Sequence, residues 1–363
     1  MGPVPPPFGG ISAHVSRLVP LLARAGLKVG VLNHFGSTDM PFVLAALNRN
    51  PINYYRIPKK FRARIVNYHY SGWSELVTLA LARGSSGARY MVTLHGSAIY
   101  RPLRSKVPMV SRITWWALRR FDTIIAVDPN VASFIQRRVE KPRIEVVPAF
   151  LESGNDDPAG YDAPIETFLD SSRVLVAAAY GVQFLDDGRE VYGLDMVAQA
   201  FTILARDRKD LRLAIFIARR QSGPKARRHL ARLERRLEHA GLRDRALIVF
   251  GLPLLPALRP NAVFVRPTRA EGDAVSVREA QSAGLPVVAS DVVSRPPGVV
   301  VFPTDDVAQL CKALRQVLDH SGQPLRASMS GNAKQRLTEP FSDALIRLYR
   351  QELAFQARET QLN

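Results

Sequence analysis

Apolar runs alternate with helix-like segments along the first 150 residues. Between residues 11 and 25, Ile11, Val15 and Leu18 recur at helical spacing and predict a helix. Short apolar runs predict strands at residues 29–32, 65–69, 90–94, 123–127 and 144–147, and helical patterns lie among them at 75–83 and 107–121. Such alternation is typical of parallel sheets wrapped by helices.

A second alternating series occupies the rest of the chain. Its apolar runs predict strands at residues 174–179, 211–217, 247–250, 263–266, 286–289 and 299–302. The sequence therefore predicts an α/β protein with two doubly wound, Rossmann-like domains that face each other across a cleft.

The composition between the two series changes abruptly. Residues 151–172 are rich in Asp, Gly, Pro and Ser, which is typical of a linker between domains. We therefore expect a first domain at residues 1–150, this linker, and a second domain at 173–338. A C-terminal helix at 339–363 is expected to return to the first domain.

No apolar strand precedes the glycine pair Gly9–Gly10, although sheet domains of this kind usually begin with one. Either the first strand has been lost or the native chain begins upstream of Met1, and we hypothesise the latter. Mass spectrometry of the native N-terminus would test this, and a mature chain beginning at Met1 would contradict it.

Hydropathy and cysteine content bear on the compartment. No stretch is long and apolar enough to predict a membrane span, and no charged segment followed by an apolar one predicts a signal peptide. The single cysteine, Cys311, lies in a helical pattern, so we expect a buried thiol and a reducing cytoplasm.

The net charge of +18 is concentrated in the first half of the chain. Residues 1–150 contain 21 Lys and Arg against 6 Asp and Glu, whereas the remainder contains 29 against 26. This asymmetry favours an anionic partner, either an anionic membrane surface or a nucleic acid. Between Arg101 and Arg120, basic residues flank Trp115 and Trp116, a combination typical of a membrane interface. A solvated basic surface around core tryptophans is the alternative. Because no RNA-binding aromatic motif or recognition helix is present, we expect no nucleic-acid partner.

Candidate chemistry concentrates in residues 266–291, RPTRAEGDAVSVREAQSAGLPVVASD. Glu271 and Glu279 lie eight residues apart around a turn and the start of a helix. The backbone amides of Asp273 and Ala274, together with the dipole of that helix, favour a diphosphate. An ordinary loop and helix with surface acids is the alternative.

Two further positions are candidates for ligand contact. Gly9 and Gly10 precede a helix, where the backbone can approach a ligand closely, although a tight turn would look the same. His95 follows a strand, where ligands sit in open α/β sheets, and a histidine that only caps the strand end is the alternative.

The segments PPPFGGISAHVSRL, VTLHGS, VVPAFL and EGDAVSVREAQSAGLPVVASD together make the chain resemble glycosyltransferase family 4. These are retaining enzymes of the GT-B fold, and the resemblance is to bacterial polysaccharide-biosynthesis members. It covers nearly the whole chain.

The resemblance implies roles for matching residues. Glu271 and His95 would be catalytic, with Glu271 stabilising charge near the anomeric carbon and His95 contacting the sugar. The donor-binding residues would be Gly9, Gly10, Asp273, Ala274, Val275 and Glu279, with Glu279 accepting from the ribose hydroxyls. The implied donor is a UDP- or GDP-sugar, and the implied acceptor is a lipid-linked sugar or glycan.

The chain departs from the family pattern at two positions. Val182 and Tyr192 stand where family members usually carry an Arg and a Lys directed at the diphosphate. Substitutes for that charge would be Arg189, Arg219, Arg220 or Arg269. No Asp-x-Asp pair stands in a donor-site context, so we expect neither a metal nor another required cofactor.

These observations predict a retaining hexosyltransferase of cell-surface glycan biosynthesis. We expect it in the cytoplasm, peripheral to the inner face of the plasma membrane through its basic N-terminal domain. A catalytically weak GT-B-fold binding protein is the first alternative, because of Val182 and Tyr192. A nucleic-acid-binding protein is the second, because of charge alone.

Overall fold

The computed structural model describes residues 1–36, 38–83, 87–151, 160–170, 173–220, 223–320 and 331–362. The chain divides into two compact units. Unit 1 comprises Met1–Pro5, Ile11–Leu151 and Arg336–Asn363, and unit 2 comprises Pro6–Gly10 and Glu152–Gln335. Gly9 and Gly10, expected in the first domain, thus group with the second.

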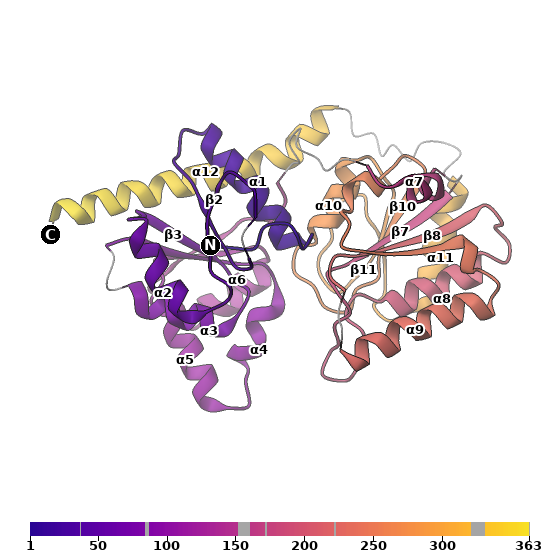
Figure 1. Cartoon of the computed structure of the whole chain (residues 1–363), viewed down its shortest axis with the longest axis horizontal. Coiled ribbons are helices and arrows are strands. Elements are labelled where there is room, and N and C mark those ends of the chain that lie inside the picture. Colours follow the sequence, from indigo (N-terminus) through magenta and orange to yellow (C-terminus); the bar gives the residue numbers. More distant parts are fainter. Residues whose placement is uncertain are drawn as a thin grey trace. The chain divides into compact units, whose positions relative to one another are not determined.

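Unit 1 consists of parallel strands and surrounding helices (Figure 1). Its elements are α1 (Gly10–Arg24), β1 (Val31–Asn33), β2 (Val43–Ala46), α2 (Pro51–Lys60), β3 (Ile65–His69), α3 (Trp73–Ala82), β4 (Arg89–Leu94), α4 (Tyr100–Leu103), α5 (Pro108–Arg119), β5 (Thr123–Ala126), α6 (Pro129–Gln136), β6 (Arg143–Val146) and α12 (Gly331–Leu362). One sheet has the order β3-β4-β5-β6 and a second consists of β1 and β2; all pairs are parallel.

Residues Met1 and Gly2 lie between the two sheets of unit 1. Gly2 pairs in parallel with Asn33 of β1. On the other side, the His69 amide of β3 donates to the Met1 carbonyl at 2.8 Å. The sequence predicts no strand before Gly9, yet these two residues provide strand-like pairing there.

Alternating side chains bury both faces of the main sheet of unit 1, as the two-residue repeat of a strand requires. On one face Val92 and Ile124 pack with α3, α5 and α6. On the other, Met91 and Ile125 pack with α1 and with Leu348 of α12. Polar contacts also hold α12: Arg89 donates to Glu352 at 2.5 Å, and Thr123 donates to the same carboxylate at 2.6 Å.

Unit 2 contains a six-stranded parallel sheet (Figure 1). Its elements are α7 (Ala163–Leu169), β7 (Arg173–Ala179), α8 (Leu194–Leu204), β8 (Leu211–Ile217), α9 (Pro224–His239), β9 (Ala246–Phe250), β10 (Ala262–Arg266), α10 (Val275–Ser282), β11 (Val287–Ser290), β12 (Val300–Phe302) and α11 (Val307–His320). The strand order is β12-β11-β10-β7-β8-β9.

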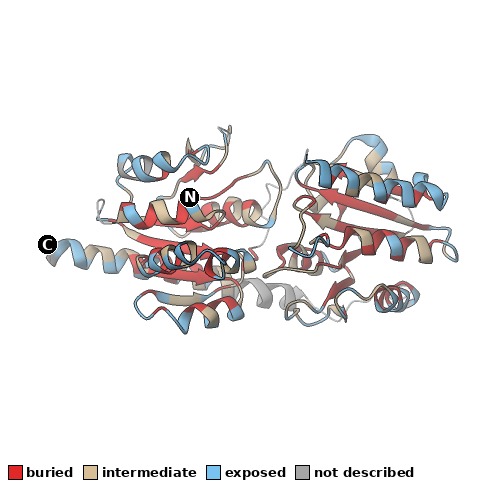
Figure 2. Ribbon diagram, turned by 90° about the horizontal axis from the view of Figure 1, so that it is seen from below, coloured by how far each residue is buried: buried red, intermediate tan, exposed pale blue. Residues whose placement is uncertain are grey.

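Helices cover both faces of this sheet, and Figure 2 shows buried strands between helices with exposed outer faces. Leu175 and Ala177 of β7 face α8, α9 and α11, whereas Val174 and Val176 face α7 and α10. The predicted burial of Cys311 is confirmed. No helix among the described residues is long and apolar enough to cross a membrane.

One predicted boundary needs correction. Within the segment expected to be a linker, residues 163–169 form α7, and Leu169 is buried in the core of unit 2. The polar composition of 151–172 conceals this short helix, which Pro164 opens at a position that tolerates proline. Residues 152–159, 171 and 172 of that segment lie outside the described residues.

Candidate active site

The strand order of unit 2 defines where a ligand is expected. From β7 the chain proceeds outward through β8 and β9, then returns to place β10 on the opposite side of β7. Open α/β sheets bind ligands at the carboxyl ends of strands next to such a switch point. Residues 267–274, which contain Glu271, leave β10 at this end and lead into α10.

Glu271 is held between two arginines. Its Oε1 accepts from Nε of Arg266 at 2.7 Å, and its Oε2 accepts from Nη1 of Arg295 at 2.6 Å. Side-chain exposure is 11% for Arg266, 5% for Glu271 and 3% for Arg295. Burial by itself would lower the pKa of Arg266, but the Glu271 carboxylate outweighs it and raises that pKa. We call these three residues the ion triad; at neutral pH it carries one net positive charge.

The remaining donor-site residues of the loop lie at the start of α10. Ala274 is the N-cap residue of α10, and its side chain makes no cap bond to the first amides of the helix. Asp273 accepts from Nε of Arg278 at 2.8 and 3.0 Å. Val275 and Glu279 are both buried on α10. This arrangement presents backbone N–H groups at a helix N-terminus, which favours an anion.

Gly9 and Gly10 lie in unit 2 next to this loop. A Cβ on Gly9 would come within 2.6 Å of the Tyr180 ring, just beyond β7. A Cβ on Gly10 would lie 3.7 Å from Val275. The structure thus brings the glycine pair to the same end of the sheet as the predicted donor-binding residues of α10, and at Gly9 the close approach excludes a larger residue.

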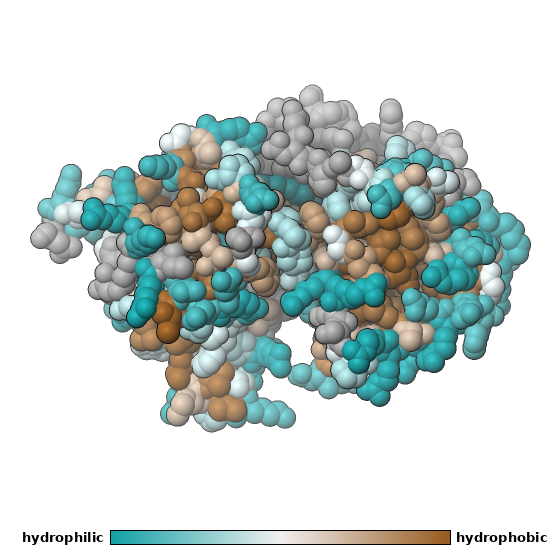
Figure 3. All heavy atoms as spheres, in the orientation of Figure 1, coloured by the Kyte–Doolittle hydropathy of each residue, from teal (hydrophilic) through white to brown (hydrophobic). Residues whose placement is uncertain are grey.

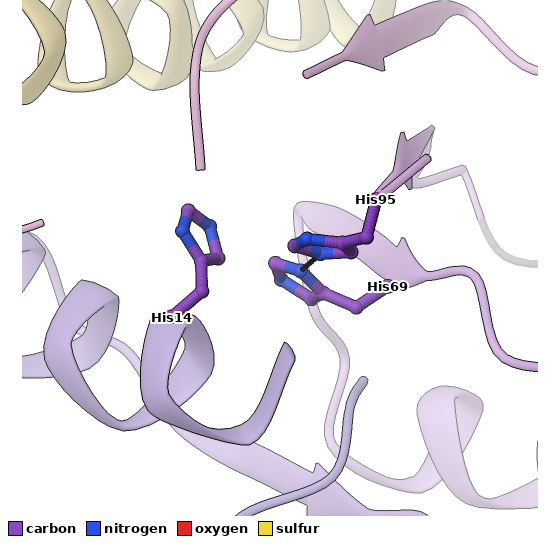
Figure 4. Close-up of side chains that lie close together, drawn as sticks. All are labelled: His14, His69 and His95. Atoms are coloured by element: carbon purple, nitrogen blue, oxygen red, sulfur yellow. Dashed lines mark hydrogen bonds between the residues drawn. The ribbon is translucent and has the colours of Figure 1, made fainter. Parts of the chain in front are cut away.

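His95 lies in unit 1, where it belongs to a cluster of three histidines (Figure 4). His14 comes from α1, His69 ends β3, and His95 follows β4. Nδ1 of His69 and Nε2 of His95 share a hydrogen bond of 2.9 Å, and their rings stack. His14 Nδ1 donates to the Ala149 carbonyl at 2.6 Å, so Nε2 of that ring is left as an acceptor.

The three imidazoles are neutral at pH 7. Burial lowers the pKa of His14 to about 4, against the opposing effect of its bond to the Ala149 carbonyl. Burial also holds the pKa of His69 and His95 well below the usual range, and the neighbouring histidines add to this. Nδ1 of His95 is buried without a hydrogen-bond partner among the described residues. The cluster is therefore an uncharged polar group with an unused nitrogen on His95.

The histidine cluster has the composition of a three-histidine metal site. One nitrogen of each ring lies within 4.8 Å of the others. The hydrogen bond between His69 and His95 occupies one nitrogen of each of those two rings. That no metal is required stays a prediction.

The contacts of the four arginines expected to replace the missing cations do not point to a diphosphate. These four are Arg189, Arg219, Arg220 and Arg269. Arg189 pairs with Asp187 and Asp305, and Arg269 pairs with Asp195 and Asp305. The guanidinium of Arg220 lies over the Phe250 ring at 4.1 Å. The backbone amide of Arg219 donates to the Tyr180 carbonyl at 2.9 Å, and its side chain has no assigned role.

The sequence led us to assign no role to Arg266, Arg295 or His14, and His69, which also ends a strand, was ranked below His95. One signal was available for Arg266, a charge that ends the otherwise apolar strand AVFVR at the edge where ligands bind. Arg295 lies in an irregular loop, where no periodicity predicts which way a side chain points. His14 occupies a buried helical position among apolar residues and has no distinguishing spacing.

Both halves of the chain match family descriptions of glycosyltransferases. Residues 8–152 match Glycosyltransferase Family 4, and residues 161–320 match Glycosyl transferases group 1. The chain belongs to glycosyltransferase family 4 and has the GT-B fold.

A curated relative and two solved structures illustrate this. The lipopolysaccharide core biosynthesis mannosyltransferase LpsB of Rhizobium meliloti (strain 1021) is 25% identical over 352 residues, which cover 92% of this chain and 90% of LpsB. Sucrose-phosphate synthase from Thermosynechococcus elongatus is similar in structure, with a TM-score of 0.69 and 16% sequence identity. The match covers 94% of this chain and 93% of the synthase. Anabaena HepE in complex with UDP is also similar in structure. Its TM-score is 0.62 and its sequence identity is 14%, and the match covers 93% of this chain and 88% of HepE.

Proposed function

We propose that this glycosyltransferase moves a hexose from a UDP- or GDP-sugar to a lipid-linked or polysaccharide acceptor in cell-surface glycan biosynthesis. The observation that carries the proposal is the grouping in unit 2 of Glu271, the N-terminus of α10 and the pair Gly9–Gly10. LpsB, named for lipopolysaccharide core biosynthesis, supports the acceptor class. HepE structures with UDP and with UDP-glucose support the donor class.

In the proposed reaction the bond between the anomeric carbon and the diphosphate oxygen breaks, and the acceptor hydroxyl attacks from the same face. Its proton passes to the departing diphosphate oxygen. Because attack and departure share one face, configuration is retained without a covalent sugar–protein intermediate. Glu271 would stabilise positive charge at the sugar, while the amides of Ala274 and Val275 would stabilise the departing diphosphate. Glu279 would hold the ribose, and His95 would contact the sugar from unit 1. No metal enters this scheme.

Two substitutions test the donor site. We expect Glu279→Ala to weaken nucleotide binding, and Glu271→Gln to lower turnover with little loss of nucleotide affinity. Calorimetry with UDP and GDP, and release of diphosphate from UDP- and GDP-sugars, measure the two effects. Glu238→Gln, on the exposed face of α9, is the matched control. Unchanged binding and unchanged turnover in both site variants would overturn the proposal.

A catalytically weak binding protein is a second candidate, because Val182 and Tyr192 provide no positive charge. It predicts that nucleoside diphosphates bind while donor turnover stays at the background rate for every sugar tested. Turnover that depends on Glu271 would exclude it.

We further propose that unit 1 contacts an anionic membrane surface at the cytoplasmic face of the plasma membrane. Val107, Met109 and Trp116 are exposed at and around α5. A surface hollow beside them is lined by Arg112, Trp115, Arg119 and Arg138. Figure 3 shows hydrophobic and hydrophilic atoms side by side over the tip formed by α4 and α5. Exposed apolar groups among cations suit a headgroup region.

Liposome sedimentation tests the membrane proposal. We expect binding to vesicles containing an anionic lipid, and weaker binding after Arg112→Glu or Trp116→Ala. Arg228→Glu, on exposed α9 of unit 2, is the control for net charge. RNA binding at physiological salt without vesicle binding would contradict the proposal and favour a nucleic-acid partner.

A further inference from the structure

The ion triad carries a net positive charge in a buried place, and Glu190 is a further acid that acts on Arg266. Arg266 and Arg295 together carry two positive charges and Glu271 carries one negative charge, with side chains 11%, 3% and 5% exposed. Excess charge removed from water is unfavourable unless an opposite charge approaches it. The triad lies at the carboxyl ends of strands beside the switch point, where an anion could do so.

Arg266 lies close to the segments of Val182 and Tyr192, where members of the family usually carry cations. Its Nη1 donates to the Ala178 carbonyl at 2.7 Å, near the end of β7 and four residues before Val182. Its guanidinium carbon lies 5.1 Å from the centre of the Tyr192 ring. One arginine from β10 therefore brings positive charge to the region flanked by both segments.

The backbone holds this arrangement in place. Gly193, next to Tyr192, has a φ of +67°, and a Cβ there would lie 2.0 Å from the carbonyl oxygen of Pro267. Pro267 directly follows Arg266. The close contact of these two backbone segments, which only glycine permits, keeps Tyr192 beside the arginine.

Both arginines keep donors for a further acceptor. A guanidinium has five N–H donors. Arg266 uses Nε, Nη1 and Nη2 toward Glu271 and the Ala178 carbonyl. Arg295 uses Nε, Nη1 and Nη2 toward Ser290 and Glu271. With one N–H used at each of these atoms, two remain on each guanidinium.

We infer that Arg266 and Arg295 bind the diphosphate of the donor, and that the diphosphate displaces Glu271 from them. The cations then come from β10 and from the loop after β11, in place of Val182 and Tyr192. Glu271 would be released toward the sugar only when a diphosphate is present. This inference rests on the proposed nucleotide-sugar transfer.

A purely positioning role makes a different prediction. If the arginines only orient Glu271, their loss lowers turnover but leaves nucleotide affinity unchanged. If they bind the diphosphate, their loss reduces the preference for a nucleoside diphosphate over the monophosphate. Removing Glu271, the competing anion, then maintains or strengthens diphosphate binding.

The test is calorimetry of the full chain with UMP and UDP, and with GMP and GDP. The measured quantity is the ratio of the monophosphate Kd to the diphosphate Kd. Glu271→Gln is compared with the double variant Glu271→Gln/Arg295→Gln, because this pair measures the loss of the arginine in the absence of the competing carboxylate. Arg266→Gln is the second site variant, and circular dichroism checks that each variant folds. Arg259→Gln removes an ion-paired arginine, 20% exposed, from another part of the same unit and is the control.

We expect the ratio to fall about tenfold or more in the double variant relative to Glu271→Gln, as for loss of a charge-assisted hydrogen bond. The ratio should stay at the wild-type value in Arg259→Gln. An equal ratio in Glu271→Gln and the double variant would overturn the inference while leaving the proposed function intact. If the wild-type chain binds neither UDP nor GDP, the proposed function itself fails, and this inference fails with it.

Discussion

The two units place polar side chains at the carboxyl ends of their parallel strands in opposite ways. In unit 1, three buried histidines remain neutral and contact one another. In unit 2, two buried arginines and a glutamate remain charged and pair. The first arrangement avoids the cost of a buried charge and becomes sensitive to acid. The second accepts that cost and becomes sensitive to the loss of any one partner.

The largest expected effect concerns the ion triad of unit 2. Arg295→Met removes the charge-assisted hydrogen bond to Oε2 of Glu271 while Arg266 still pairs with Oε1, and we expect a loss of about 3 kcal/mol in the unfolding free energy of unit 2. Urea denaturation, which leaves ionic strength unchanged, measures it. Arg295→Lys keeps the charge and should recover part of the loss. A change below about 1 kcal/mol for Arg295→Met would show that the triad is not structurally important.

The next prediction concerns the neutral side. The pKa of His14 is about 4 in the folded chain, below the ordinary value of 6.5. Its contribution to stability is therefore complete above pH 6.5 and is lost as the pH falls toward 4, because the unfolded state binds the proton first. We expect a loss of roughly 3 kcal/mol over that range for unit 1. His14→Gln should flatten this dependence in urea titrations. An equally steep curve in the variant would refute the assignment.

Glu190 of unit 2 is expected to give the opposite pH dependence of stability from His14 of unit 1. Burial raises the pKa of Glu190 to about 7, although its carboxylate accepts from the amides of Tyr192 and Leu194. Its contribution is complete below the ordinary value of 4.5 and is lost as the pH rises through 7. Unit 2 should therefore lose roughly 2 kcal/mol between pH 5 and 7. Glu190→Gln should remove this loss and the exposed Glu238→Gln should not; the reverse result would exclude Glu190 as its source.

The smallest predicted effect concerns an uncharged contact in unit 1. Nδ2 of Asn67 donates to the Tyr349 hydroxyl at 2.7 Å, which connects β3 to α12. Tyr349→Phe removes only the acceptor, so we expect a loss of about 1 kcal/mol. Thermal unfolding should detect it. A loss as large as that from Arg295→Met would mean that neutral and charged contacts do not differ here.

Much of the fold follows from the apolar pattern, because strands buried on both faces produce continuous apolar runs. The run at residues 65–69 coincides with β3, and 211–217 coincides with β8. Helix α7 was missed because it is short and lies in a polar stretch. Gly9 and Gly10 were grouped with the wrong unit because proximity along the chain does not determine packing.

The site could be predicted only in part. Glu271 and Glu279 were found from local spacing, which the turn and helix preserve in three dimensions. Arg295 reaches Glu271 across 24 residues, and His14 meets His69 across 55, so no local pattern records either contact. The four arginines expected to replace the missing charge were chosen by type alone. Their partners, such as Asp195 and Asp305, became apparent only in three dimensions.

The return of α12 to unit 1 has a consequence for biosynthesis. Arg89 and Thr123 both bond Glu352, which follows them by 263 and 229 residues, with the Glu152–Gln335 part of unit 2 in between. On the ribosome, unit 2 can therefore complete its contacts while the sheet of unit 1 still lacks the helix that covers one face. The apolar residues Met91 and Ile125 on that face then stay incompletely covered until α12 emerges, so unit 1 depends for longer than unit 2 on protection from aggregation.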